Sequence, residues 1–547
     1  MPLSIGTTTI ALFSLLLSSI YGFPLNDWNQ PCFNGECTYS TNSGSIKIWG
    51  SPDTITDITT AAGWEILDCD PNALKQNIRL VCTEPNGCSH LYQANGPVGK
   101  LVRLPQDCGG NAFARISHSW VHEDQSLPAN LARTIRSRGS SNETSANGTI
   151  SDVQGLALDT DFAAGNSTQT GNVSIAIIGS NVPNATASVE DVEVTAAKAV
   201  SFFTDLFDFD EEITKNLPAV DIDQTFPVVE DTISCASSDD VPAFNASIKV
   251  DVGAKAHAVV SLGLVATGTL LPPNLDEFMV FVGLNADLEG TLELTGSASG
   301  TADSGKIDLY EVSITGIDFP GILTLGPSFK IQAQATADLN MGANLSIDLA
   351  YQAENAKLFF PPSNEASSNA TFSPLDSPLK LSVSPSVNSS SSTISAHLIP
   401  TIDLGVSALG GIAEATVFLD FDASISTNLS LNASAVANVT TQGDNSTSSN
   451  VDGCVDIGAG FDVNLGADGS FFGLFDESTQ LTLFSKEFEL YNKCFGSSSN
   501  SSASAKRDLD QLRSPIHKRA LTCAAFDTAN LVSLAEEIIS AASVIAQ

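Results

Sequence analysis

The strongest pattern in this chain is a strict alternation of apolar and polar residues. Between residues 331 and 351 the even positions are nearly all polar, whereas every odd position is apolar: Ile331, Ala333, Ala335, Ala337, Leu339, Met341, Ala343, Leu345, Ile347, Leu349 and Tyr351. Side chains of a β-strand point to opposite faces with a period of two residues. The alternation therefore predicts extended structure with one buried face and one face in water.

The same pattern recurs elsewhere and keeps its phase over long distances. Apolar residues occupy even positions in residues 248–264 and 278–294, and odd positions in residues 417–439 and 455–467. A two-residue hairpin turn reverses which parity points inward, so a run of constant parity contains no simple turn of that kind. A run of about 20 residues is then either one strand, about 70 Å long, or strands joined through odd-length loops.

Residues 23–135 differ from the rest of the chain. They contain short strand-like runs, six of the ten cysteines and all four tryptophans, Trp28, Trp49, Trp64 and Trp120. A unit of this size has a limited core, and disulfides are expected to reinforce it. A buried tryptophan in so small a module is expected to be core, although its flat apolar face also suits stacking on a sugar ring.

We predict a mainly β protein: a small disulfide-stapled β module followed by a large elongated antiparallel β-sandwich with long strands. One short helix is expected near residues 196–209, where apolar residues recur at helical intervals. The predicted division is a signal peptide at 1–22, the Cys/Trp-rich β module at 23–135, a Ser/Asn-rich linker at 136–171, an acidic glycosylated β domain at 172–495 with an exposed insert at 361–395, a linker with dibasic sites at 496–519, and an amphipathic, helical C-terminal tail at 520–547.

Three features indicate the secretory pathway. The apolar run at residues 10–20 is too short to cross a bilayer but suits the core of a signal peptide. Ten cysteines fit an oxidising compartment. Fourteen Asn-x-Ser/Thr sequons are candidate N-glycosylation sites: Asn142, Asn147, Asn166, Asn172, Asn184, Asn245, Asn344, Asn369, Asn388, Asn428, Asn432, Asn438, Asn445 and Asn500.

The cysteines are expected to form disulfides. Cys454 and Cys494 bracket the last strands and are expected to pair, which leaves Cys235 and Cys523 as a further pair. The pairing within the module stays open, because six cysteines allow many connectivities; they are Cys32, Cys37, Cys69, Cys82, Cys88 and Cys108. Dibasic pairs ending at Arg507 and Arg519 are candidate processing sites, the alternative being a solvated basic patch. A Cys235–Cys523 bridge would keep the tail attached after cleavage at Arg519.

The net charge of −38 lies almost entirely in the middle of the chain. Residues 1–138 carry −2 and residues 506–547 are balanced, which leaves −36 for the segment between them. A field of this sign repels phosphate backbones and anionic lipids, so nucleic acid and membrane surfaces are poor partners.

No motif in the chain predicts catalysis or a cofactor. Neither a Gly-x-Ser-x-Gly elbow, a His-Glu-x-x-His pair nor a phosphate-binding glycine loop occurs. Asp303-Ser304-Gly305 is better interpreted as a turn than as half of an aspartic protease site. His118 and His122 flank Trp120 as a partial metal set, for which a plain surface pair is the simpler interpretation. The acidic cluster at residues 205–212 favours a solvated helix end over a Ca²⁺ site.

Three segments resemble an uncharacterised group of secreted fungal proteins, in which a Cys-rich N-terminal module precedes a long glycosylated β-rich domain. The resemblance implies a fungal extracellular or cell-wall setting and brings no known activity. It rests on Ile48-Trp-Gly-Ser-Pro-Asp-Thr-Ile-Thr-Asp57 with Ala62-Gly-Trp-Glu-Ile-Leu-Asp-Cys69, on Phe319-Pro-Gly-Ile-Leu-Thr-Leu-Gly-Pro-Ser-Phe-Lys-Ile-Gln-Ala-Gln-Ala335, and on Phe484-Ser-Lys-Glu-Phe-Glu-Leu-Tyr-Asn-Lys-Cys494.

These observations favour a non-enzymatic, N-glycosylated structural or adhesion protein of the cell wall or extracellular matrix. Its expected partners are cell-wall polysaccharide or other extracellular glycoproteins, and no cofactor is expected. The first alternative is an extracellular carrier that holds an apolar ligand between Ala-lined sheets, which requires an apolar cavity of several hundred Å³. The second alternative is a secreted hydrolase of unrecognised type, which requires convergent acid and base groups in a cleft.

Overall fold

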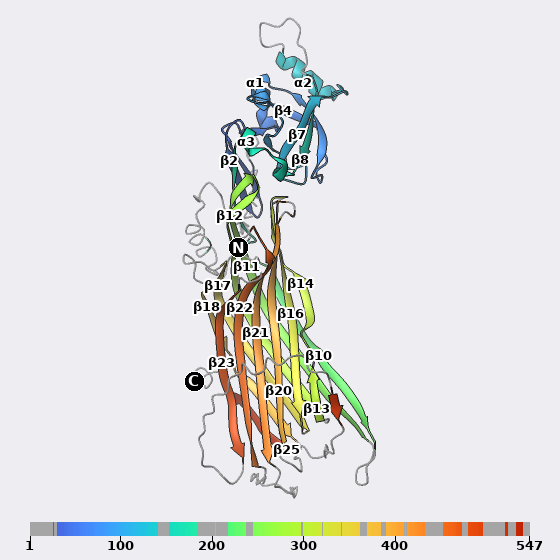
Figure 1. Cartoon of the computed structure of the whole chain (residues 1–547), viewed down its shortest axis with the longest axis vertical. Helices are drawn as coiled ribbons and strands as arrows, with labels where there is room; N and C mark the ends of the chain where they lie inside the picture. The colour runs from blue at the N-terminus through green and yellow to red at the C-terminus, as the bar shows by residue number, and fades with distance from the viewer. Residues whose placement is uncertain are drawn as a thin grey trace, which may run out of the picture.

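The computed structural model shows a mainly β protein whose strands pair antiparallel, apart from one parallel pair in the smallest sheet (Figure 1). Within the described residues the strands form sheets of ten, nine and six strands. The structure describes residues 26, 30–139, 152–182, 203, 217–236, 244–296, 299–319, 321–340, 342–361, 369–383, 390–409, 411, 413–432, 452–472, 480–495, 520–522 and 532–539.

The six-stranded sheet forms the centre of the N-terminal module and has the order β3-β6-β7-β8-β5-β4. One face of this sheet packs on a small core that contains Trp64, Leu80 and Ile116. Its strands are β3 (Ile55–Asp57), β4 (Trp64–Asp68), β5 (Gln76–Cys82), β6 (Leu101–Arg103), β7 (Phe113–Val121) and β8 (Gln154–Asp159). The short helices are η1 (Thr60–Ala62), α1 (Pro85–Cys88), η2 (Ser89–Tyr92), α2 (Ala129–Gly139), η3 (Phe162–Ala164) and α3 (Ser167–Thr170).

The two larger sheets pack face to face as a long sandwich. The ten-stranded sheet contains β1 (Glu36–Thr41), β2 (Gly44–Gly50), β9 (Val173–Ser180), β10 (Ala219–Cys235), β11 (Phe244–Leu271), β12 (Asn274–Gly296), β17 (Ala343–Phe360), β18 (Asn369–Pro374), β19 (Ser377–Val383) and β25 (Val532–Ile539). The nine-stranded sheet contains β13 (Ser299–Asp303), β14 (Ile307–Ser313), β15 (Ile317–Phe319), β16 (Leu323–Leu339), β20 (Ser390–Ala408), β21 (Ala413–Asn432), β22 (Asp452–Ser470), β23 (Gln480–Phe495) and β24 (Ala520–Thr522).

The alternating runs are long strands, and their phase follows the connections between them. The run at 331–351 spans two strands in different sheets, since β16 ends at Leu339 in the nine-stranded sheet and β17 begins at Ala343 in the ten-stranded sheet, and the buried side chains at this end of both strands are odd-numbered. The two-residue turn between β11 and β12 would reverse the parity, but a register shift after Thr267 restores it. As a result, β11 extends for 28 residues and β12 for 23 residues with even-numbered side chains facing the core over most of their length.

The interior of the sandwich combines small and aromatic side chains. Alanines at inward positions such as Ala333 and Ala335 are fully buried and let the sheets approach closely. Between them, aromatic rings from the two sheets meet directly. The ring centroids of Tyr351 and Phe461 are 4.7 Å apart, and those of Phe278 and Phe471 are 4.8 Å apart. The apolar side chains of both sheets form one continuous core.

The N-terminal module lies at one end of the sandwich and shares a sheet with it (Figure 1). Strands β1 and β2 form a hairpin, β2 pairs with β9, and β9 pairs with the end of β11. The loop between β15 and β16 contacts the module, because a Cβ on Gly321 would overlap the buried side chain of Asn111. The module is therefore joined to the sandwich by backbone pairing as well as by side-chain contact.

Residues predicted to lie in the linker at 136–171 instead include β8, which is an inner strand of the six-stranded sheet. Its alternation spans only six residues, and the composition around it is rich in Ser, Asn and Gly. Pairing with β7 and β5, which are distant in sequence, holds this short strand in place. Pairing with these strands therefore outweighs the local composition, which by itself favours a linker.

Two further predictions were wrong. The insert at 361–395 is not simply an exposed loop, because β18 and β19 pair with β17, and Leu379 and Leu381 are buried. Residues 532–539 form the strand β25 rather than a helix, because β19 offers a free edge with which they pair. Short apolar runs fit a strand as well as a helix, and the available partner determines which one forms.

Several predictions concern residues outside those that the structure describes. They are the signal peptide at 1–22, the processing sites at Arg507 and Arg519, and the helix near 196–209 except for Phe203. Phe203 is buried, with its ring centroid 4.4 Å from that of Phe281 on the ten-stranded sheet.

We expect Phe461→Ala to destabilise the sandwich by about 3–5 kcal/mol, because it removes a buried ring that contacts Tyr351 and leaves a cavity. Chemical unfolding followed by far-ultraviolet circular dichroism measures this change. Ser426→Ala, on the outward-facing side of the neighbouring strand, is the control and should change stability by less than about 0.5 kcal/mol. Equal effects of the two substitutions would contradict the assignment of inward and outward faces.

Candidate functional site

Disulfides hold the N-terminal module together. The structure pairs Cys32 with Cys37, Cys69 with Cys108, and Cys82 with Cys88. The Cys69–Cys108 bridge joins the end of β4 to the loop before β7 and closes the longest of the three loops, 39 residues in sequence. These bridges constrain a module whose core is small.

Three further cysteines lie in strands of the sandwich. Cys454 and Cys494 are direct partners on β22 and β23 and form a disulfide with a Cα–Cα distance of 4.0 Å. Cys235, at the end of β10, is also disulfide-bonded. Cys523 lies outside the described residues, directly after Thr522 of β24.

The face of the six-stranded sheet that points away from the Trp64 core carries aromatic and polar side chains. His118 is the partner of Ala157, which is the partner of Asn77, and Trp120 is linked in the same way through Gly155 to Arg79. Directly paired residues project from the same face of a sheet. Neighbouring strands lie about 4.8 Å apart, so His118 and Asn77 stand about 10 Å apart across β8.

Arg79 connects three parts of this face. Its guanidinium donates to Asp68 at 2.9 Å and to the carbonyl of Ser126 at 2.8 Å, and it lies 3.0 Å from Asp124. Hydrogen bonds from Ser126, together with this positive charge, hold the pKa of Asp124 below its ordinary value. The segment after β7 is thereby fastened to β4 and β5.

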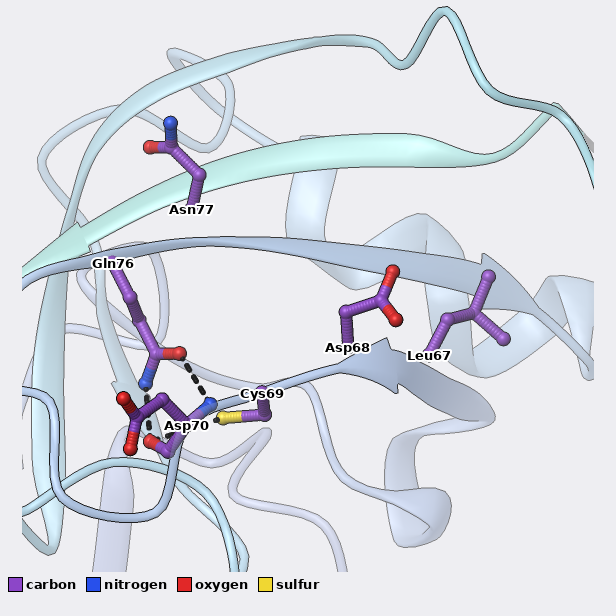
Figure 2. A pocket seen from close by; sticks show the side chains of 6 residues that line it. All are labelled: Leu67, Asp68, Cys69, Asp70, Gln76 and Asn77. Carbon is purple, nitrogen blue, oxygen red and sulfur yellow. Dashed lines mark hydrogen bonds between the residues drawn. The ribbon is translucent and has the colours of Figure 1, made fainter.

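A shallow depression opens beside this network, with a volume of about 530 Å³. Figure 2 shows Gln76 and Asp70 gathered at one end and Asp68 and Leu67 at the other. The Gln76 side chain accepts from the Asp70 amide at 2.8 Å and donates to the Asp70 carbonyl at 3.0 Å. The lining is mainly polar and consists of Leu67, Asp68, Cys69, Asp70, Gln76 and Asn77.

The module also buries charged groups, which the sequence did not reveal. Lys100 is only 2% exposed and donates to the carbonyl of His90 at 3.1 Å. Arg103 and Asp57 form a buried ion pair at 2.7 Å. Burial lowers the pKa of Lys100 and also that of His90, where the positive charge of Lys100 adds to the effect.

The tryptophans divide between core and surface. Trp64 is buried in the module core, whereas Trp49 on β2 is exposed and Trp120 on β7 is partly exposed. Trp28 lies outside the described residues. His118 and His122 have no third metal ligand nearby, since no group of three His, Cys, Asp or Glu side chains suited to a metal ion occurs in the part of the chain that the structure describes.

Four of the sequons can be placed with their side chains. Asn166, Asn172 and Asn344 are exposed, and Asn428 is half-buried on the outward face of β21. The other sequons lack a described side chain: Asn142, Asn147, Asn184, Asn245, Asn369, Asn388, Asn432, Asn438, Asn445 and Asn500.

Carboxylates on the outer face of the nine-stranded sheet are held by neighbouring side chains. Asp420 accepts from the Thr401 hydroxyl at 2.7 Å, and Asp422 lies 2.9 Å from Nδ1 of His397. Burial raises the pKa of Asp420, and the nearby Asp403 and Asp422 add to this rise. Asp303, Ser304 and Gly305 form a turn, in which the Gly305 amide donates to the Asp303 carboxylate at 2.9 Å. The acidic cluster at 205–212 lies outside the described residues.

One family model matches part of the chain. Residues 276–496, which extend from β12 to β23, match the model of a domain of unknown function, DUF7223. Neither a curated protein nor a solved structure matches the chain. Among the described residues, no helix is both long and apolar enough to cross a membrane.

We expect stability to fall as the pH drops below about 6.5, because His90 binds a proton less tightly in the folded than in the unfolded state. Its contribution is complete above the ordinary pKa and is lost as the pH falls toward the lower pKa of the folded protein. Thermal unfolding of the full chain between about pH 7 and pH 5 measures the slope. His90→Gln should flatten it, whereas His257→Gln, at an exposed residue paired with Asp221, serves as the control. An unchanged slope in His90→Gln would contradict this assignment.

Proposed function

We propose that this protein is a non-enzymatic, N-glycosylated structural or adhesion protein of the cell wall or extracellular matrix. The sandwich acts as a stiff spacer, and the N-terminal module at its end makes the contact with other wall or matrix components. The observation that carries this proposal is the length of the paired strands. The 28 residues of β11 correspond to about 90 Å at 3.3 Å per residue.

Two properties of the sandwich support a spacer. Long antiparallel neighbours such as β11 and β12 pair along nearly their whole length, which resists bending. The ring contacts of Tyr351 with Phe461 and of Phe278 with Phe471 place side chains of both sheets in direct contact. Direct contact between the sheets at these two levels favours a packed spacer over a carrier that holds an apolar ligand there.

The extracellular setting is supported by covalent and surface features. Both the module and the sandwich contain disulfides within them, which fits an oxidising compartment. The sequon residues Asn166, Asn172 and Asn344 are exposed and accessible to the glycosylation machinery. The charge of −36 in the middle of the chain keeps such an elongated surface soluble.

Fractionation of a fungal host that secretes the tagged full chain into wall and medium tests the proposal. We expect the protein to remain with the isolated wall fraction after washing with salt and detergent, since a structural or adhesion protein is retained by its partners. Recovery of the protein only from the medium would contradict the proposal. Recovery of an apolar molecule, stoichiometric with the purified chain, in an organic extract would instead identify a carrier.

We further expect Asn344 to carry a glycan, because it is exposed on β17 and opens the sequon Asn344-Leu345-Ser346. Peptide mass spectrometry of the secreted protein detects the modification. Asn344→Gln and Ser346→Ala should each abolish it, the second variant with the asparagine still present. An unmodified Asn344 in the wild-type protein would count against the assignment of this face to solvent and glycan.

A further inference from the structure

We propose that the partly exposed face of the module around Trp120 binds a neutral polysaccharide of β-linked glucose or N-acetylglucosamine units. The indole ring of Trp120 would stack on the C–H face of a pyranose, and the polar groups beside it would bind the hydroxyls. The assignment names a binding site and ligand class for the structural or adhesion role, and rests on that role only for the biological setting.

The Trp120 ring lies flat on the sheet. A Cβ placed on Gly155 would overlap Cε2 of the indole, while Cζ2 and Nε1, both bonded to Cε2, would be almost equally distant at 2.6 and 2.7 Å. Such a set of distances is expected when the ring presents its face, not its edge, to Gly155. One face of the indole is therefore supported by the backbone of β8, and a glycine is required there. The opposite face points away from the sheet.

Neighbouring rings extend this apolar surface along β7. The His118 ring centroid is 5.5 Å from that of Trp120 with an angle of 20° between the planes, and the His122 ring follows at 6.2 Å and 34°. These separations correspond to offset rings, not to directly superposed ones. A row of three rings suits a chain of sugar units better than a single monosaccharide.

The rim of the row carries hydrogen-bonding groups. Nδ1 of His122 accepts from the Asp124 amide at 3.0 Å, so the neutral imidazole has its N–H on Nε2, which is available as a donor. Across β8, the exposed Asn77 offers an amide at the border of the depression shown in Figure 2. Asp68 accepts from Arg79 and adds a carboxylate to the same border. Donors and acceptors around an aromatic face match the alternation of apolar and hydroxyl surfaces on a pyranose.

Charge selects a neutral ligand. The carboxylates of Asp68, Asp70 and Asp124 lie around the site. Their local negative charge disfavours polyanions, including acidic polysaccharides and nucleic acids. The positive charge of Arg79 is already engaged by Asp68 and Asp124 and is not available to offset this repulsion.

Binding of the purified full chain to two soluble probes tests the site. The probes are a β-1,3-glucan oligosaccharide and a chitin oligosaccharide, and calorimetry or tryptophan fluorescence gives the affinity. We expect Trp120→Ala to weaken binding by about tenfold or more, and Trp120→Phe to retain part of it. Gly155→Val should also weaken binding, because its side chain displaces the ring from the sheet. Trp49→Ala is the matched control, since Trp49 is an exposed tryptophan on β2, outside the six-stranded sheet.

Each outcome bears on the proposal. Binding of either probe that is lost in Trp120→Ala and retained in Trp49→Ala supports it, and the preferred probe identifies the sugar. No binding of either probe to the wild-type chain, or equal affinity in Trp120→Ala, would overturn it. If Trp120→Ala still associates with isolated walls while neither probe binds, the structural or adhesion role survives and only the polysaccharide site fails. The Trp120→Phe variant keeps the test valid if the alanine variant does not fold.

Discussion

The packing of two sheets through side chains that alternate with a period of two is the constraint on which the rest of the structure depends. Each strand must keep its apolar positions on one face over 17 residues or more in β16, β17 and β20–β22. A slip of one residue would expose the whole apolar set of a strand and bury its polar set. The register shift between β11 and β12 shows how a turn that would break this constraint is corrected.

The mixture of alanine and aromatic residues in the interior follows from the same constraint. Alanine contributes little apolar area, so a sheet lined by Ala333, Ala335 and Ala337 gains stability mainly from its length and from close approach of the opposite sheet. Rings such as Phe461 occupy the places where the sheets are held apart. Length is therefore a consequence of composition as well as a property suited to a spacer.

The N-terminal module is stabilised by different interactions from those of the sandwich. Its core is small, and three disulfides and the buried pair Arg103–Asp57 supplement it. Gly155 on β8 lets the indole ring of Trp120 lie against the backbone. This tryptophan is therefore at the surface, although the sequence favoured a core position. The sandwich thus provides the length of the molecule, and the module provides the surface with exposed aromatic and polar side chains. Backbone pairing of β2 with β9 joins the two.

The amino-acid sequence by itself determined which residues of the sandwich face inward, because that pattern depends only on neighbours two positions apart. It also indicated the mainly β class and the unusual strand length. Contacts between distant residues determined the remaining features: the place of Gln154–Asp159 inside a sheet, the pairing of Val532–Ile539 with β19, and the meeting of Trp120 with Gly155 and Arg79. The local signal of each is too weak to determine it, since each arises when one segment supplies the edge or the space that another segment fills.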